Sequence, residues 1–229
     1  MIKAILMDFN GVIIDDESIQ WEAYQEVFEA EGIELTEAEY FGALGMDDRT
    51  LVRATLEKAG KKADESKVDE IVAAKAVKWK AAVEKELPLF EGIDRFVKKM
   101  SREFALGIVS MAGRDSIEYV LEKSNLRKFF ATIVSAEDVD KCKPDPACYR
   151  LGFNLLDAFR TANDHLPMTH GECLVIEDSP PGVIGARAAD LPVLGVANTV
   201  STDELRAAGA GATAKDLRDW MPESIRRVF

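Results

Sequence analysis

The chain has 229 residues, of which 47% are hydrophobic, so one large domain or a main domain with a smaller insert can bury a substantial core. A formal net charge of −12 makes duplex nucleic acid and anionic membranes poor partners, and no apolar run is long enough to span a bilayer. Cys142, Cys148 and Cys173 show no paired spacing and the N-terminus lacks signal-peptide features, which favours a cytoplasmic protein with reduced thiols.

Short apolar runs predict the strands of a sheet, and helical patterns separate them. The runs cover residues 4–7, 105–109, 131–134, 174–176 and 193–196. Apolar residues recur with the spacing of one helix face over 93–100 and again over 117–121. Strands that alternate with helices predict an α/β fold, with a Rossmann-like parallel sheet covered by helices on both faces. Ligands of such sheets bind beyond the carboxyl ends of the strands.

One long segment interrupts the alternation of strands and helices. Residues 18–86 show no convincing strand pattern, only helical stretches, and Thr36 is placed to cap the start of one of these helices. Pro88 and Gly92 bracket the return of the chain into the core. The sequence therefore predicts a core domain formed by residues 1–16 and 88–229, and an inserted all-helical domain formed by residues 17–87.

Polar residues with catalytic chemistry follow the apolar runs at four points. These residues are Asp8, Ser110, Lys143 and the acidic pair Glu177 and Asp178. Each has an ordinary structural alternative: a turn or helix cap for Asp8 and Ser110, a surface cation for Lys143, and a solvated turn for the acidic pair. Four such features in succession, each beyond an apolar run, favour one shared site.

The combined chemistry of these residues predicts phosphoryl transfer. Asp8 and Asp178 supply the oxygen ligands that Mg²⁺ prefers, with Glu177 as a further ligand or as a support behind them. Lys143 adds a compact positive charge, while Ser110 and the backbone N–H groups after it donate hydrogen bonds to phosphoryl oxygens. Attack by Asp8 then gives an aspartyl-phosphate, which water hydrolyses.

The four motifs together resemble those of the haloacid dehalogenase superfamily, in the branch of β-phosphoglucomutases and sugar phosphatases that carry a helical cap after the first motif. The resemblance implies Asp8 as the nucleophile, Ser110 as a phosphate ligand, Lys143 as the charge balancer and Asp178 as a metal ligand. In that family the residue at position 10 also lends its backbone carbonyl to the metal, a role that Asn10 preserves.

Three further residues are candidates for binding the substrate. Residues 45–49 resemble the substrate-specificity loop of these caps, so Arg49 is either a ligand of a second anionic group or an arginine on a helix surface. Arg114 either grips the phosphate or flanks a helix. Met111 follows Ser110 and offers a backbone N–H group to the phosphate.

Asn10 stands where the relatives have a carboxylate that protonates the leaving alcohol and activates water. An amide cannot ionise, and loss of such a group typically costs on the order of 10²–10⁴-fold in rate. Asn10 is either an engineered change, a natural feature of a slow or non-catalytic protein, or a latent acid. The last hypothesis arises because Gly11 leaves the following backbone nitrogen unhindered, which favours deamidation of Asn10 to Asp.

The leading functional prediction is therefore a Mg²⁺-dependent phosphatase of a small phosphorylated metabolite, of the sugar-phosphate class, acting as a monomer. A phosphomutase is the second enzyme hypothesis, although Gln20 or Trp21 stands where mutases of this branch carry a histidine. A catalytically weak protein that binds a phosphosugar without turnover is the third.

Overall fold

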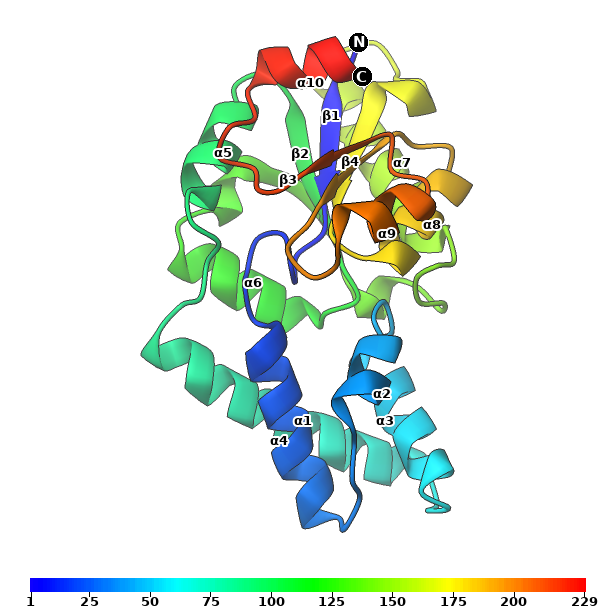
Figure 1. Ribbon diagram of the computed structural model, residues 1–229. Coiled ribbons are helices and arrows are strands. Elements are labelled where there is room, and N and C mark those ends of the chain that lie inside the picture. The colour runs from blue at the N-terminus through cyan, green and yellow to red at the C-terminus, as the bar shows by residue number, and fades with distance from the viewer.

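The computed structural model describes all 229 residues and consists of a sheet with helices on both faces and a group of four helices at one end (Figure 1). The sheet has six parallel strands in the order β3-β2-β1-β4-β5-β6. The strands are β1 (Ala4–Met7), β2 (Ala105–Val109), β3 (Phe130–Val134), β4 (Cys173–Glu177), β5 (Val193–Val196) and β6 (Ala212–Ala214). This architecture confirms the predicted α/β fold.

The central strands are buried on both faces, which explains why they read as unbroken apolar runs. Alternate residues of β1 enter two different clusters: Ile5 and Met7 pack on one face of the sheet, and Ala4 and Leu6 on the other. The helices α5 (Ile93–Met100), α6 (Arg114–Lys123) and α10 (Pro222–Val228) pack on the first face. The helices α7 (Ala147–Ala162), α8 (Pro180–Ala188) and α9 (Thr202–Ala207) pack on the second.

Four helices lie between β1 and α5 and form a separate unit, which we call the cap (Figure 1). They are α1 (Glu17–Ala30), α2 (Glu37–Gly42), α3 (Asp48–Lys58) and α4 (Glu65–Lys85). Thr36 caps α2 as predicted, with Glu39 completing a capping box. The cap has its own hydrophobic cluster of 11 buried residues, while Ala23, Trp79 and Val83 of its helices join the cluster that contains Ile5 and Met7 of the sheet.

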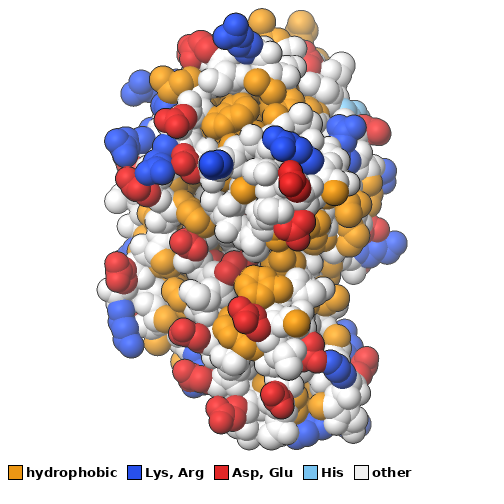
Figure 2. Space-filling view, viewed as in Figure 1, with side chains coloured by type: hydrophobic (Ala, Val, Ile, Leu, Met, Phe, Trp, Pro, Cys, Tyr) orange, Lys and Arg blue, Asp and Glu red, His pale blue; other side chains and the backbone are white.

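Figure 2 shows one face of the molecule. On this face, acidic side chains are spread over the cap, and acidic and basic side chains are intermixed over the core. This distribution follows from the excess of 41 acidic over 29 basic residues. No helix is both long enough and apolar enough to cross a bilayer.

Candidate active site

The carboxyl ends of the central strands meet at the edge of the sheet that faces the cap. Met7 pairs with Ile108 of β2 and with Ile176 of β4, so the residues that follow these strands lie side by side. Between this edge and the cap lies a pocket of about 100 Å³. Its core end is lined by Asp8, Asn10, Ser110, Met111, Lys143 and Asp178, and its cap end by Glu17, Tyr24, Tyr40, Asp48 and Lys75.

Asp8 and Lys143 form a buried ion pair at the floor of the pocket. Lys143 Nζ lies 2.9 Å from Asp8 Oδ2, and Asp8 Oδ1 accepts a hydrogen bond from the Phe9 N–H at 2.7 Å. Burial, reinforced by the neighbouring Glu177, raises the pKa of Asp8 to about 7 although Lys143 opposes the shift. Burial disfavours the charged form of Lys143, but the carboxylates of Asp8 and Glu177 outweigh this effect and raise its pKa.

Glu177 is the second carboxylate that holds Lys143. Its Oε1 lies 2.6 Å from Lys143 Nζ and accepts a hydrogen bond from the Tyr149 hydroxyl. Its Oε2 accepts hydrogen bonds from the backbone N–H groups of Asp178 and Ser179 and from the Ser179 hydroxyl, at 3.0 to 3.1 Å. Because both oxygens of this fully buried carboxylate are occupied, Glu177 positions the lysine rather than pointing into the pocket.

The acidic residues at the strand ends fit a hard divalent cation. Carboxylate oxygens of Asp8, Glu177 and Asp178 all lie within 4.8 Å of one another. Burial and the two neighbouring negative charges raise the pKa of Asp178 well above its ordinary value. An oxygen donor set with this much unbalanced negative charge suits Mg²⁺. Asp8 and Asp178 line the pocket and could bind such a cation there, whereas Glu177 does not line it.

Gly11 permits the close approach of the loop after β1 to Asp178. Its φ of +72° lies in the left-handed region, and a Cβ atom at this position would collide with the Asp178 carboxylate. The Thr199 hydroxyl donates a hydrogen bond to the same carboxylate. The glycine of the first motif is therefore required by the site itself.

Ser110 follows β2 and lies in the wall of the pocket, where its hydroxyl accepts a hydrogen bond from the Ala112 N–H at 3.1 Å. Met111 lines the pocket beside it. Arg114 does not line the pocket: its guanidinium donates to the Asp138 carboxylate and to the Ile133 carbonyl. This position corresponds to the second alternative for Arg114, in which it flanks a helix.

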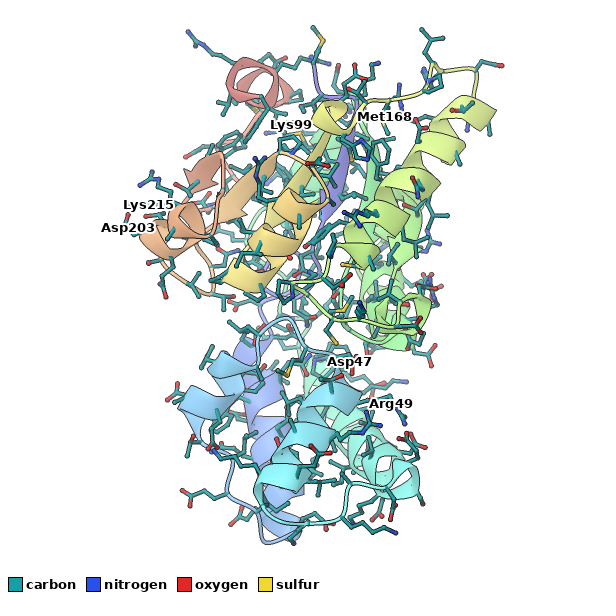
Figure 3. The ribbon with its side chains drawn as sticks, turned by 90° about the vertical axis from the view of Figure 1, so that its right-hand side faces the viewer. Asp47, Arg49, Lys99, Met168, Asp203 and Lys215 are labelled. Carbon is teal, nitrogen blue, oxygen red and sulfur yellow. The ribbon has the colours of Figure 1, made fainter.

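Arg49 likewise lies outside the pocket. Its guanidinium pairs with Glu65 and Asp69 on the flank of the cap, and its side chain is 45% exposed (Figure 3). Asp47, two residues earlier, lies at the boundary with the core and accepts a hydrogen bond from the Cys142 thiol at 3.0 Å (Figure 3). The arrangement corresponds to the helix-surface alternative for Arg49, because its guanidinium pairs with two carboxylates and does not line the pocket.

Asn10 faces a carboxylate that was not predicted from the sequence, that of Asp16. Asn10 Nδ2 lies 2.9 and 3.0 Å from the two oxygens of Asp16, which is fully buried. Asp16 also accepts hydrogen bonds from Gln20 at 2.8 Å and from the Trp79 indole of the cap at 2.7 Å. Burial raises the pKa of Asp16, and these three donors oppose the shift. Asp16 thus ties the catalytic loop to the cap.

The same contacts oppose deamidation of Asn10. Its amide is held by Asp16, and the Gly11 N–H, which would attack that amide, donates instead to the Ile14 carbonyl at 2.9 Å. Formation of a cyclic intermediate requires all of these hydrogen bonds to break.

The residues at the cap end of the pocket were also not predicted from the sequence. One feature of the sequence, however, indicated a polar contact inside the cap. Lys75 lies on the buried stripe of α4, in register with Ile71 and Trp79 at helical spacing. A lysine on an otherwise apolar stripe is buried only when it is paired, which points to a polar partner inside the cap.

Comparison with known proteins identifies the family of the chain. The profile of the haloacid dehalogenase-like hydrolases matches residues 5–196. The "Putative phosphatase YhcW" of Bacillus subtilis is 29% identical over 202 residues, which cover 88% of this chain and 86% of that protein. The "Phosphorylated carbohydrates phosphatase" of Thermotoga maritima is 28% identical over 230 residues, with coverage of 100% and 98%.

A crystal structure of β-phosphoglucomutase from Clostridium difficile has the same fold, with a TM-score of 0.85 at 19% identity and coverage of 100% of this chain and 97% of that one. Because the family profile spans most of the chain, the protein belongs to the haloacid dehalogenase-like hydrolases.

Proposed function

We propose that the protein is a Mg²⁺-dependent phosphatase that transfers the phosphoryl group of a small phosphorylated metabolite, of the sugar-phosphate class, to Asp8 and then to water. The observation that carries the proposal is the convergence of Asp8, Lys143 and Asp178 at one edge of the sheet. The class of substrate rests on the relative from Thermotoga maritima, which is named for phosphorylated carbohydrates.

The pocket supplies each group that this reaction needs except a proton donor. An oxygen of Asp8 forms the new bond to phosphorus, while the bond to the substrate oxygen breaks and its electrons stay on that oxygen. Lys143 holds the Asp8 carboxylate at 2.9 Å, and Ser110 with the N–H of Met111 would bind the phosphoryl oxygens. A Mg²⁺ ion held by Asp8, Asp178 and the backbone carbonyl of Asn10 would supply positive charge against the phosphate.

Asn10 makes the proposed reaction slow. Its amide donates to Asp16 and has no acidic proton for the departing alcohol, so water must protonate that oxygen. We expect turnover on the order of 10²–10⁴-fold below that of a variant with a carboxylate here. Without a proton donor at position 10, the pocket would also retain a phosphorylated ligand for longer.

The test is the release of inorganic phosphate from a panel of phosphorylated metabolites with Mg²⁺. The wild type, Asn10→Asp and the inactive control Asp8→Asn are assayed in parallel. We expect slow release by the wild type, faster release by Asn10→Asp and none by Asp8→Asn. Tight binding of a sugar phosphate without release, even by Asn10→Asp, would instead identify a binding protein. Transfer of phosphate to a second hydroxyl of the sugar would identify a mutase.

A further inference from the structure

Three side chains from three cap helices form a compact polar group at the end of the pocket opposite Asp8. Lys75 of α4 donates to both oxygens of Asp48, at 2.8 and 3.1 Å, and the Tyr24 hydroxyl of α1 donates to the same carboxylate. Lys75 Nζ also lies 4.8 Å from the centre of the Tyr24 ring. Lys75 is only 5% exposed, whereas the side chain of Asp48, at the start of α3, is 34% exposed. We call these residues the cap triad.

The cap end of the pocket contains no unpaired positive charge. Lys75 and Lys143 are the only lysines or arginines that line the pocket, and Lys143 is engaged by Asp8 and Glu177 at the opposite end. Lys75 is neutralised by Asp48. A second carboxylate, that of Glu17, also lines this end and accepts a hydrogen bond from the Tyr40 hydroxyl at 2.6 Å.

This charge balance suits hydroxyl groups and opposes phosphate. A sugar hydroxyl is both a donor and an acceptor, so it can donate to Asp48 or Glu17 and accept from Lys75 without disturbing the ion pair. A second phosphate would bring further negative charge against two carboxylates in a partly buried site, where electrostatic repulsion is weakly screened. Arg49, a candidate from the sequence for binding a second anionic group, does not line the pocket and pairs with Glu65 and Asp69 instead.

On the basis of the proposed function, we propose that the cap triad restricts the enzyme to monophosphates whose other end is uncharged and rich in hydroxyl groups. Asp48 is the residue that excludes bisphosphates. It does so in two ways, by its own negative charge and by neutralising Lys75, which would otherwise be free to pair with a second phosphate.

The test compares fructose 6-phosphate with fructose 1,6-bisphosphate, and uses p-nitrophenyl phosphate as a reference for the core end of the site. The wild-type value of kcat/KM for the monophosphate should exceed that for the bisphosphate by at least about tenfold. Asp48→Asn frees Lys75 and should reduce this ratio by about tenfold or more, mainly through KM. Lys75→Met leaves the carboxylates uncompensated and should increase the ratio.

Glu70→Gln is the matched control, because it removes the same charge from a cap side chain that is 67% exposed, lies outside the pocket and does not pair with Arg49. It should leave the ratio at its wild-type value. All variants are measured in the wild-type and Asn10→Asp backgrounds, so that slow turnover does not hide the selectivity.

A purely structural role of the triad would lower both activities together and would not move the ratio in opposite directions for Asp48→Asn and Lys75→Met. Equal use of the two fructose phosphates by the wild type would overturn the inference while leaving the phosphatase intact. Failure of every protein, including Asn10→Asp, to hydrolyse p-nitrophenyl phosphate would count against the proposed function itself.

Discussion

The side-chain amide of Asn10 lies between the two oxygens of the buried Asp16, at 2.9 and 3.0 Å. The carboxylate that this loop lacks at position 10 is thus present six residues later, although it does not line the pocket. An amide beside a carboxylate forms a hydrogen bond, whereas two carboxylates at this distance repel each other and one of them must take up a proton. The identity of residue 10 is therefore coupled to that of residue 16.

The first prediction follows from this coupling. Asn10→Asp should raise phosphatase turnover on the order of 10²-fold or more, because it supplies an acid/base group. It should also lower the free energy of unfolding by ~1.5–3 kcal/mol at pH 8, because the hydrogen bond to a charged group becomes a repulsion. Urea unfolding at pH 8, read together with the phosphate-release rate, measures both effects.

The double variant Asn10→Asp, Asp16→Asn exchanges the two groups and is the matched control. It should keep the gain in turnover and recover most of the lost stability, since an amide again faces a carboxylate. If the single and double variants unfold at the same urea concentration, the two positions are not coupled.

The second prediction concerns the chemical stability of Asn10. Because its amide is bound to Asp16 and the Gly11 N–H is bound to Ile14, deamidation should be slower in the folded protein than in a synthetic peptide of residues 5–15. Peptide mass spectrometry after weeks at 37 °C and neutral pH measures both rates. The Asp16→Ala variant removes one restraint and should deamidate faster than the wild type.

Equal deamidation in the protein and the peptide, accompanied by a rise in activity, would instead support Asn10 as a latent acid.

The third prediction concerns Mg²⁺ and pH. In the metal-free protein, burial and Glu177 raise the pKa of Asp8 to about 7, whereas in the unfolded chain it is ordinary. The stability that this group contributes is fully present below the unfolded pKa and is lost as the pH rises through about 7. Mg²⁺ requires the ionised form, so its binding should displace a proton below about pH 7 and should tighten as the pH rises toward that value.

Calorimetry of Mg²⁺ binding in two buffers of different ionisation enthalpy measures the number of protons released at each pH. Thermal unfolding with and without EDTA should show a larger stabilisation by Mg²⁺ at pH 8 than at pH 5.5. The Asp8→Asn variant should bind Mg²⁺ weakly and should release fewer protons than the wild type, because Asp178 is then the one remaining ligand with a raised pKa. Wild-type binding that stays constant between pH 5.5 and 8 would contradict this assignment of the ligand.

Most of the core end of the site could be predicted from the sequence because Asp8, Ser110 and Asp178 each directly follow a strand. Buried parallel strands appear as short apolar runs, and parallel strands end at the same edge, so Asp8, Ser110 and Asp178 were placed together without any knowledge of side-chain packing. The strand β6 was not predicted, because Ala212–Ala214 is only three residues long and is partly exposed.

The cap end could not be predicted in the same way. Successive residues of an α-helix point about 100° apart, so the rotation of α3 decides whether Asp48 or Arg49 enters the pocket. That rotation depends on how α3 packs against α4, which also determines whether Lys75 meets Asp48. Motif resemblance pointed to the loop around residues 45–49, which borders the pocket, and left open whether Arg49 binds substrate or lies on the helix surface.

The last prediction concerns closure of the cap onto the core. Gly45 has a φ of +87°, and a Cβ atom built on it would lie 2.9 Å from Pro181 Cγ and 3.2 Å from Lys143 Cβ. Gly45→Ala therefore strains the backbone by ~1–3 kcal/mol and presses the loop away from the core. We expect kcat/KM for a sugar phosphate to fall by about tenfold or more, with much less effect on p-nitrophenyl phosphate, which does not reach the cap triad.

Gly32→Ala is the control: this cap glycine also has a positive φ, of +64°, but a Cβ atom there meets no other atom within 4 Å. Both variants should lose stability to a similar degree because both strain a left-handed residue, and thermal unfolding checks this. Only Gly45→Ala should lose activity on the sugar phosphate, because only its new methyl group lies between the cap and the lysine that holds Asp8. Equal losses of activity in the two variants would show that backbone strain in the cap, and not obstruction of its closure, limits the reaction.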